Sequence, residues 1–505
     1  MSILKKLASE TASYGVSTIL GRSLNFLLVF IHTAAFLPGE LGVNIKLYSY
    51  VAVANIIYTY GMETAFFRFA AEDKIKYYNI IQSAILISSA FFSLILIIFA
   101  TPIITYLGYA GKENFLIWLA LILAIDAITA IPFARLRLEK QTAKFVKAKI
   151  INILINIFFN IFFLLILKKI ADGDYLNSLQ SLAQKLYNPK IGAGYIFLAN
   201  LLANATFIYF LRKELFDFKF QFDKDELKRL LLYSYPVMLM VLASTFNLLF
   251  DRLLLERLLP TGFYPERTSQ EALGIYGNVY KLSIFMALAT QAFRYAAEPF
   301  FLSKIDDKQS PETLANVTKW FLITCIFIWL GVCLNLDWLK MLFLRKKIYW
   351  EGISVVPILL LANLFLGIYY NISVWFKLNK KTYFGTLITL IGLVITVLLN
   401  IILIPKMGYM GCAIAFLISC FSMTATCYFL GQRYYPVPYK IGSAIGYIIS
   451  AGLLIYCVMH IQFSSLWVSV PYHLLLMALY TAGVVIVERK TIIPLKVRDK
   501  YAFLR

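Results

Sequence analysis

Two cationic side chains lie inside long apolar stretches of the sequence, where a charge is costly. Arg22 stands near the middle of the stretch from 10 to 35, and Lys281 stands in the stretch from 272 to 301. A charge at the centre of a membrane-spanning helix costs about 2.5 to 3.5 kcal/mol, so it usually faces a wet cleft or a partner. Two cations in one cleft suit a doubly charged pyrophosphate, and we therefore predict that Arg22 and Lys281 bind an anionic substrate.

Acidic residues inside the apolar stretches allow two further interpretations. Arg22 could pair with Asp126, and Lys281 with Asp251, as structural ion pairs without a role in binding. Alternatively, Asp126, Asp251 and Glu63 are candidates for binding a coupling proton or sodium ion, because an exporter that works against a gradient needs an ion-binding site. Both interpretations stay open from the sequence.

Arg68 and Arg294 occupy equivalent places in two similar hexapeptides. Each is followed four residues later by a glutamate, Glu72 or Glu298. This i, i+4 spacing is typical of an ion pair on a helix surface, which contributes a few tenths of a kcal/mol. The functional alternative is a basic cytoplasmic mouth that collects an anionic head group.

Aromatic residues make up 16% of the chain, and most of them are expected to anchor or pack the membrane spans. Tyr276 and Tyr280, which precede Lys281 in the same apolar run, are the exceptions, because their rings could stack against sugar rings. The six cysteines show no CxxC spacing, so we expect no metal site. The three histidines have no carboxylate and nucleophile beside them, so we predict no catalytic residues and a protein that is not an enzyme.

These residues must be positioned by helices that span a membrane. Of the 505 residues 60% are hydrophobic and 15% charged, whereas a soluble domain is about a quarter charged. A helix crosses the hydrocarbon with about 20 apolar residues, and barrel strands would instead show short alternating patterns. Fourteen apolar runs are visible: 10–35, 42–67, 78–107, 114–136, 148–168, 191–211, 230–255, 272–301, 315–336, 352–376, 382–404, 410–430, 441–461 and 469–488. The sequence therefore predicts an all-α polytopic membrane protein.

The net charge of +21 is expected to reside in the loops, where it reports orientation and not nucleic-acid binding. Roughly two thirds of the 48 Lys and Arg residues fall on the side of the two termini when fourteen spans are assumed. The positive-inside rule then places both termini in the cytoplasm.

An internal repeat divides the chain. Phe67-Arg68-Phe69-Ala70-Ala71-Glu72 matches Phe293-Arg294-Tyr295-Ala296-Ala297-Glu298, and Leu41-Gly42-Val43 matches Leu273-Gly274-Ile275 in the spans that carry them. Each repeat contains six spans, an even number, so the two copies share one orientation and are related by an axis along the membrane normal. We predict a six-helix lobe at 1–215, a second at 216–435, and two extra helices with a basic cytoplasmic tail at 436–505.

Several short motifs resemble a known family. They are Asn247 with Asp251-Arg252, then Leu273-Gly274-Ile275-Tyr276 through Lys281, and Asn400-Ile401-Ile402-Leu403-Ile404-Pro405 with Gly408 and Gly411-Cys412-Ala413-Ile414-Ala415. The chain resembles the polysaccharide flippases, which carry O-antigen or other oligosaccharide repeat units, of the multidrug/oligosaccharidyl-lipid/polysaccharide exporter superfamily. Cys412 stands where that family more often has alanine.

The resemblance implies a transporter of the bacterial cytoplasmic (inner) membrane that exports a polyprenyl-pyrophosphate-linked oligosaccharide by alternating access during lipopolysaccharide or other surface polysaccharide biosynthesis. No cofactor is expected, apart from coupling to a proton or sodium gradient. The expected partners are the lipid-linked oligosaccharide, membrane lipids, and the polysaccharide polymerase and glycosyltransferases of the same pathway, with no nucleic acid.

Three alternatives remain for the function. A lipid II flippase of peptidoglycan synthesis would share the fourteen spans and the cationic cleft. A cation-coupled multidrug exporter of the same superfamily would be expected to have twelve spans and an acidic residue deep in its first helix, where this chain has Arg22. A membrane-embedded glycosyltransferase or polymerase would need catalytic carboxylates and a larger external loop than the segment near Asp172 provides.

Overall fold

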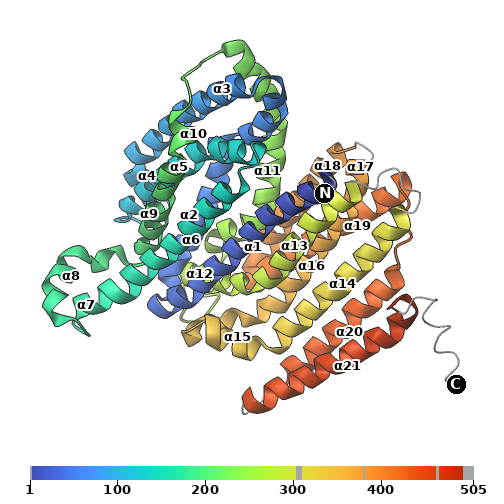
Figure 1. The fold of residues 1–505 in the computed structure, drawn as a ribbon. Coiled ribbons are helices and arrows are strands. Elements are labelled where there is room, and N and C mark those ends of the chain that lie inside the picture. The colour runs from blue at the N-terminus through green and yellow to red at the C-terminus, as the bar shows by residue number, and fades with distance from the viewer. Residues whose placement is uncertain (1–2, 303–309, 379–380, 462–465, 493–505) are drawn as a thin grey trace, which may run out of the picture.

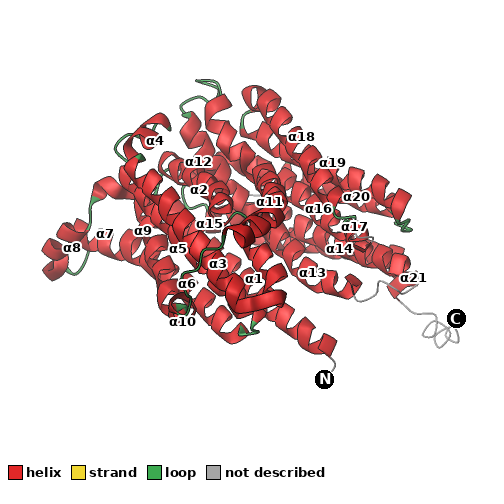
Figure 2. Cartoon of the chain, turned by 90° about the horizontal axis from the view of Figure 1, so that it is seen from above, coloured by secondary structure: helices red, strands yellow, loops and turns green. Residues whose placement is uncertain are grey.

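The computed structural model describes the backbone of residues 3–302, 310–378, 381–461 and 466–492. Side chains are described from residue 19 onward within these ranges, except at 296, 298–300, 302, 310, 466 and 490–492. Throughout the described residues the regular structure is helical, and the helices form an elongated bundle (Figures 1 and 2). The predicted all-α fold class is therefore confirmed.

The first half of the chain supplies one group of helices. They are α1 (Ile3–Ala35), α2 (Pro38–Thr59), α3 (Met62–Ile98), α4 (Ala100–Tyr106), α5 (Glu113–Leu138), α6 (Thr142–Ile161), the π-helix η1 (Phe162–Leu167), α7 (Lys168–Asp172), η2 (Asn177–Leu179), α8 (Gln180–Leu186), η3 (Pro189–Gly194), α9 (Tyr195–Phe210) and α10 (Arg212–Phe216). The helices α7 and α8 form an extension that projects away from the bundle (Figure 2). This extension contains the segment near Asp172, which connects the predicted spans 148–168 and 191–211.

The second half of the chain supplies the other group and the two last helices. They are α11 (Lys224–Leu258), α12 (Ser269–Tyr280), η4 (Lys281–Ser283), α13 (Ile284–Leu302), α14 (Ser310–Leu334), α15 (Leu336–Phe343), η5 (Lys347–Val355), α16 (Val356–Ile372), α17 (Val374–Leu378), α18 (Tyr383–Met407), α19 (Tyr409–Tyr434), α20 (Ile441–Met459) and α21 (Leu466–Ile492). The first half of α11 packs on the other group, because Leu230 belongs to the buried cluster that includes Phe66 and Phe69. The exact lobe boundaries at 215 and 435 stay a prediction.

The number of membrane crossings follows from one helical hairpin. Twelve segments within the described residues are long and apolar enough to cross a membrane, and one of them, Pro38–Ile98, has 61 residues. Its backbone leaves the helical region at Asp73, and the rings of Phe66 and Tyr78 lie only 6.0 Å apart, whereas twelve residues of straight helix would separate them by about 18 Å. The segment therefore crosses twice, and with the apolar part of α1, Ile19–Ala35, the total is fourteen, as predicted.

Local sequence signals explain where the two central helices of the second half begin. The Asp223 carboxylate accepts hydrogen bonds from the backbone N–H groups of Asp225 and Glu226, which caps α11. Thr268 and Glu271 form a reciprocal capping box that begins α12. Such caps satisfy N–H groups that have no partner within the helix.

The repeat predicted from sequence is visible as a symmetric crossing of α2 and α12. A Cβ added to Gly42 would lie 2.2 Å from the backbone oxygen of Gln270, and one added to Gly274 would lie 1.8 Å from the backbone oxygen of Pro38. Each glycine thus faces the residue four positions before its repeat equivalent. Reciprocal contact of this kind is the mark of a two-fold relation, so a pseudo-two-fold axis passes between the two helices.

One side of the bundle is closed by contacts between the two groups of helices. Figure 1 places the beginning of α1 and the end of α21 on one side, here called the terminal side. On the opposite side the Lys46 ammonium pairs with Glu256 at 2.7 Å, and Tyr109 donates to the same carboxylate at 2.6 Å. Thr33 also donates to the Phe343 carbonyl at 2.8 Å. The contact of α2 with α12 belongs to this same closed side.

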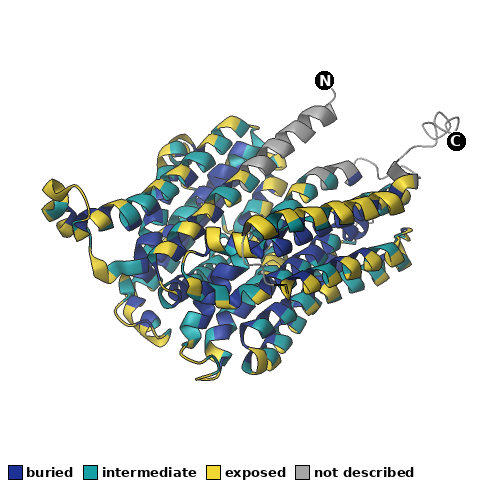
Figure 3. Cartoon of the chain, turned by 90° about the horizontal axis from the view of Figure 1, so that it is seen from below, coloured by how far each residue is buried: buried dark blue, intermediate teal, exposed yellow. Residues whose placement is uncertain are grey.

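The last two helices are fastened to the bundle by a buried ion pair. The Lys319 ammonium in α14 lies 2.6 Å from the Glu488 carboxylate in α21, and the two side chains are only 7% and 6% exposed. Tyr447 in α20 donates to the same carboxylate at 3.0 Å. Exposed residues elsewhere follow the outer faces of the helices, as expected for surfaces that meet lipid (Figure 3).

Removing one member of this pair is expected to destabilise the protein by about 3 to 5 kcal/mol, because the remaining buried charge loses its partner. Lys319→Met should therefore lower the thermal unfolding temperature in detergent markedly. The double variant Lys319→Met with Glu488→Gln removes both charges of this pair and keeps an acceptor for Tyr447, so it should recover most of the loss. Equal destabilisation of both variants would contradict this role.

Candidate functional site

A cavity of about 510 Å³ lies between the two groups of helices. Its walls come from α1, α2, α6 and α9 of the first half and from α12, η4, α13 and α16 of the second half. Its polar lining residues are Arg22, Asn25, His32, Tyr48, Asn156, Asn160, Asn200, Tyr280, Lys281, Ser283 and Asn363. None of the described residues that line it is acidic. The structure thus brings Arg22 and Lys281, which are far apart in sequence, into one cavity.

Arg22 lies in α1 with its side chain exposed to the cavity. Among the described side chains it makes no ion pair, and Asp126 accepts instead from the Asn204 amide at 2.9 Å. The pairing of Arg22 with Asp126 is therefore absent from the described structure.

Lys281 lies in the short 3-10 segment η4 that interrupts the eighth span. Its ammonium donates to the Asn278 side chain at 3.0 Å, while Asp251 accepts from the Tyr276 hydroxyl at 2.5 Å and from the Arg252 backbone. The alternative pairing of Lys281 with Asp251 is thus also absent from the described contacts. A 3-10 segment within a longer helix often marks a functional hinge.

Arg252 is a third cation next to the cavity, and it was not selected as a site residue from the sequence. Its guanidinium lies 3.8 Å from the ring centre of Tyr280, which lines the cavity, and its charge also acts on Lys281. Its Nη2 atom is buried and has no hydrogen-bond partner among the described residues. An arginine next to Asp251 within a span was the available signal, and only the packing shows that it lies against a tyrosine of the cavity lining.

A chain of amides and one histidine forms the wall contributed by α1 and α6. His32 Nε2 lies 2.8 Å from the Asn160 side-chain oxygen, and Asn160 donates to Asn156, which in turn donates to Asn25 at 3.4 Å. His32 was not selected from the sequence, because a histidine near the end of a span suggested no role. Asparagines inside apolar spans were the missed signal, because amides offer both donors and acceptors to a polar ligand.

The two tyrosine candidates have different surroundings. Tyr280 lines the cavity, while Tyr276 is fully buried and uses its hydroxyl on Asp251. In this conformation the ring of Tyr276 is buried within the protein, so it is not accessible for the predicted stacking on a sugar. Stacking on a sugar stays a prediction for Tyr280, whose opposite face is occupied by Arg252.

Arg68 and Arg294 do not line the central cavity. Arg68 is exposed in α3 and makes no ion pair among the described residues, because Glu72 pairs with Arg229 at 3.0 Å. Arg294 lies 5.1 Å from the ring centre of Tyr370 and lines a second cavity, of about 330 Å³. The side chain of its predicted partner, Glu298, lies outside the described residues. A role of the two arginines in collecting the substrate stays a prediction.

The three acidic candidates for ion coupling are separated. Asp126 lies in α5 behind the cavity wall, close enough to act on Tyr48 and on Lys149. Asp251 is buried beneath Tyr276, and Glu63 forms an ion pair with Arg137. Groups of three or more potential metal ligands do not occur among the described residues. Asp126, Asp251 and Glu63 therefore do not form one cluster, and their role in ion coupling stays a prediction.

The fold, unlike the sequence, has clear relatives. No family model and no curated protein matches the sequence. Among solved structures, a lipid II flippase MurJ in an inward closed conformation superposes with a TM-score of 0.70 at 15% identity, covering 95% of this chain and 99% of that one.

Two conformations of a multidrug resistance MATE family transporter of the MOP superfamily are also similar. The inward-facing one has a TM-score of 0.62 at 14% identity, covering 86% of this chain and 99% of that one. The outward-facing one has a TM-score of 0.54 at 15% identity, covering 87% and 97%. The chain therefore has the fold shared by MurJ and the MATE transporters, with its cationic cavity at the junction of the two helix groups.

Proposed function

We propose that this protein translocates a polyprenyl-pyrophosphate-linked oligosaccharide across the cytoplasmic membrane during surface polysaccharide biosynthesis. The observation that carries the proposal is the cavity lining, in which Arg22 and Lys281 face a space without any acidic group among its described lining residues. Away from bulk water such cations interact strongly with an anion. Arginine can also bind phosphate oxygens through two parallel hydrogen bonds. The five lining asparagines offer donors and acceptors for sugar hydroxyls.

Alternating access is the mechanism that fits this geometry. Closure on the side opposite the termini leaves substrate entry to the terminal side, which the positive-inside rule assigns to the cytoplasm. Opening on the other side requires α2 and α12 to separate and the pair of Lys46 with Glu256 to break. The two helix groups would rock about the cavity while the lipid tail remains in the bilayer, and no covalent bond would change.

A lipid II flippase is the second candidate, and the MurJ likeness over nearly the whole chain favours it. Its substrate would present the same pyrophosphate to Arg22 and Lys281, so the cation pair alone does not discriminate between the two. A multidrug exporter for cationic compounds is disfavoured by the cavity, because like charges in a poorly solvated space repel strongly.

The test is transport by the purified protein in proteoliposomes. Fluorescent polyprenyl-pyrophosphate oligosaccharide, fluorescent lipid II and a cationic dye would be supplied separately, and a membrane-impermeant reagent would report which of them changes leaflet or side. The proposal expects translocation of the oligosaccharide. Translocation of lipid II alone would establish the second candidate, and transport of the dye alone would overturn both.

Coupling to an ion gradient is assigned to Asp126 in this proposal, because it lies behind the cavity wall and, among the described residues, its carboxylate accepts a single hydrogen bond, from the Asn204 amide. Asp126→Asn is expected to leave substrate binding intact and to make translocation insensitive to an imposed proton or sodium gradient, since the amide cannot ionise. The matched variant Glu63→Gln, in the pair with Arg137, should keep the gradient dependence. Unchanged gradient dependence in Asp126→Asn would exclude this residue.

The same proposal places the protein in the bacterial inner membrane beside the polymerase and glycosyltransferases of its pathway, with both termini in the cytoplasm. Labelling of cysteines introduced at the chain ends by an impermeant thiol reagent, in intact and in permeabilised cells, tests the orientation.

A further inference from the structure

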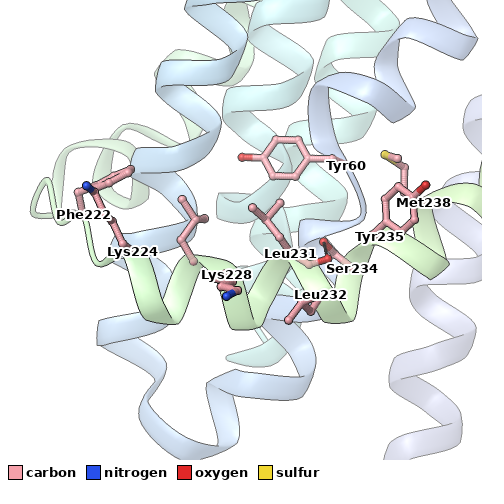
Figure 4. Close-up of a pocket in the computed structure, with 10 residues that line it drawn as sticks. Tyr60, Phe222, Lys224, Lys228, Leu231, Leu232, Ser234, Tyr235 and Met238 are labelled. Carbon is pink, nitrogen blue, oxygen red and sulfur yellow. Dashed lines mark hydrogen bonds between the residues drawn. The ribbon is translucent and has the colours of Figure 1, made fainter.

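A groove of about 550 Å³ runs along the outer face of the first half of α11. Figure 4 shows its wall, with residues following α11 from Lys224 to Met238 and Tyr60 facing them from the turn between α2 and α3. It shares no lining residue with the central cavity. The groove is therefore separate from the candidate substrate site.

The walls of the groove are apolar and accessible to lipid. Leu231, Leu232 and Tyr235 line it and are 41%, 69% and 57% exposed. The wall opposite α11 is formed by Tyr60. It lies close to α11 because the helix backbone approaches Gly61, where an added Cβ would lie 2.8 Å from the Ser234 backbone oxygen. Tyr60, the residue before this glycine, overhangs the groove where α11 leaves the first group of helices (Figure 4).

Two cations lie at one end of this apolar groove. Lys224 and Lys228 are one helical turn apart on α11, are exposed, and form no ion pair with any described residue. They lie where α11 begins, at the terminal side, while the apolar residues follow toward the membrane interior. This arrangement of a charged mouth and an apolar channel complements an anionic head group attached to a hydrocarbon chain.

The dimensions and charge favour one occupant over the others. From Lys224 to Met238 the helix rises about 21 Å, which exceeds half of the ~30 Å hydrocarbon core but does not cross it. A lipid of one leaflet matches this length, whereas a partner's spanning helix would need the full thickness. A symmetric second copy of the chain would bring its own Lys224 and Lys228 to the same groove, where the four positive charges would repel one another.

We propose that this groove is a binding site for an anionic glycerophospholipid of the terminal-side leaflet, with Lys224 and Lys228 holding the phosphate head group and the groove holding an acyl chain. The lipid would fill the seam where α11 passes from one helix group to the other. It is a bound structural lipid and not the transported substrate, because the groove does not open into the lining of the cavity that holds Arg22 and Lys281.

The test measures lipid binding by the purified full chain with native mass spectrometry, without any transport step. Dioleoyl phosphatidylglycerol is the probe, and dioleoyl phosphatidylcholine has the same chains with no net charge. The wild type should prefer phosphatidylglycerol, and K224Q/K228Q should bind it roughly 30-fold more weakly, from two lysines near the surface. K224R/K228R should bind as the wild type does, which also shows that substitution at these positions preserves the fold.

Two further variants separate this site from general charge attraction. K147Q/K213Q removes the same charge from exposed lysines elsewhere, neither of which is ion-paired among the described residues, and it should leave binding unchanged. L231W fills the groove without altering charge and should weaken binding of both lipids. Equal loss in K147Q/K213Q and K224Q/K228Q, or undiminished binding in L231W, would overturn the proposal.

Discussion

Replacing Arg22 with alanine is expected to reduce translocation of a pyrophosphate-linked substrate about 100-fold or more, while membrane insertion stays normal. A close charge pair that loses one partner costs about 2 to 5 kcal/mol, and each 1.4 kcal/mol corresponds to a factor of ten. Arg22 makes no ion pair among the described side chains. Its removal therefore deprives no described carboxylate of a partner and should not disturb folding. The measurement is leaflet exchange of the fluorescent substrate in proteoliposomes at matched protein density.

Graded variants make this result specific to the cavity. Arg22→Lys keeps the charge but loses the planar guanidinium that binds two phosphate oxygens at once. Its translocation rate should lie between those of the wild type and Arg22→Ala. Lys281→Met should also reduce translocation strongly, because it removes the other cation of the lining. Lys147→Ala removes an exposed charge that does not line the cavity and should have no effect. Wild-type rates in Arg22→Ala would remove the main support for an anionic substrate.

Substituting alanine for Gly274 is expected to prevent closure of the side opposite the termini. The added Cβ would lie 1.8 Å from the Pro38 oxygen, so the two helices must separate by roughly 1.5 Å or more to restore van der Waals contact. The obstacle is backbone and not a flexible side chain, so it cannot move aside locally. Because the closed state is one half of the transport cycle, translocation should fall to near background.

The pseudo-symmetry supplies the companion variant and the chain supplies the control. Gly42→Ala meets the Gln270 oxygen at 2.2 Å and should have the same effect as Gly274→Ala. Gly446→Ala lies in α20 with open space around its Cβ and should leave transport unchanged, with a small gain from better helix propensity. Distances between spin labels on α2 and α12 should be longer in both interface variants. Unchanged distances with full transport would show that the crossing tolerates a side chain.

The sequence by itself determined the number of spans and the repeat. In a bilayer every spanning segment must be apolar and must satisfy its own backbone, so hydropathy alone reveals it. The turn at Asp73 lies between two predicted spans, and the 3-10 segment at Lys281 lies within one span. Neither changes the number of membrane crossings. The sequence showed Gly42 and Gly274 only as matching positions of the repeated Leu-Gly motifs. The structure shows that each of them contacts the backbone of the other helix.

Only the tertiary structure decided which polar residues share the cavity. The cost of burying a charge predicted that Arg22 and Lys281 face water or a partner, but the choice between these depends on where neighbouring helices place their side chains. The described structure leaves both proposed ion pairs unmade, adds His32 and a row of asparagines to the lining, and places Arg252 against the lining residue Tyr280. Helix rotation and the packing between the two groups fix these neighbours, and that information is spread over the whole chain and is absent from any single span.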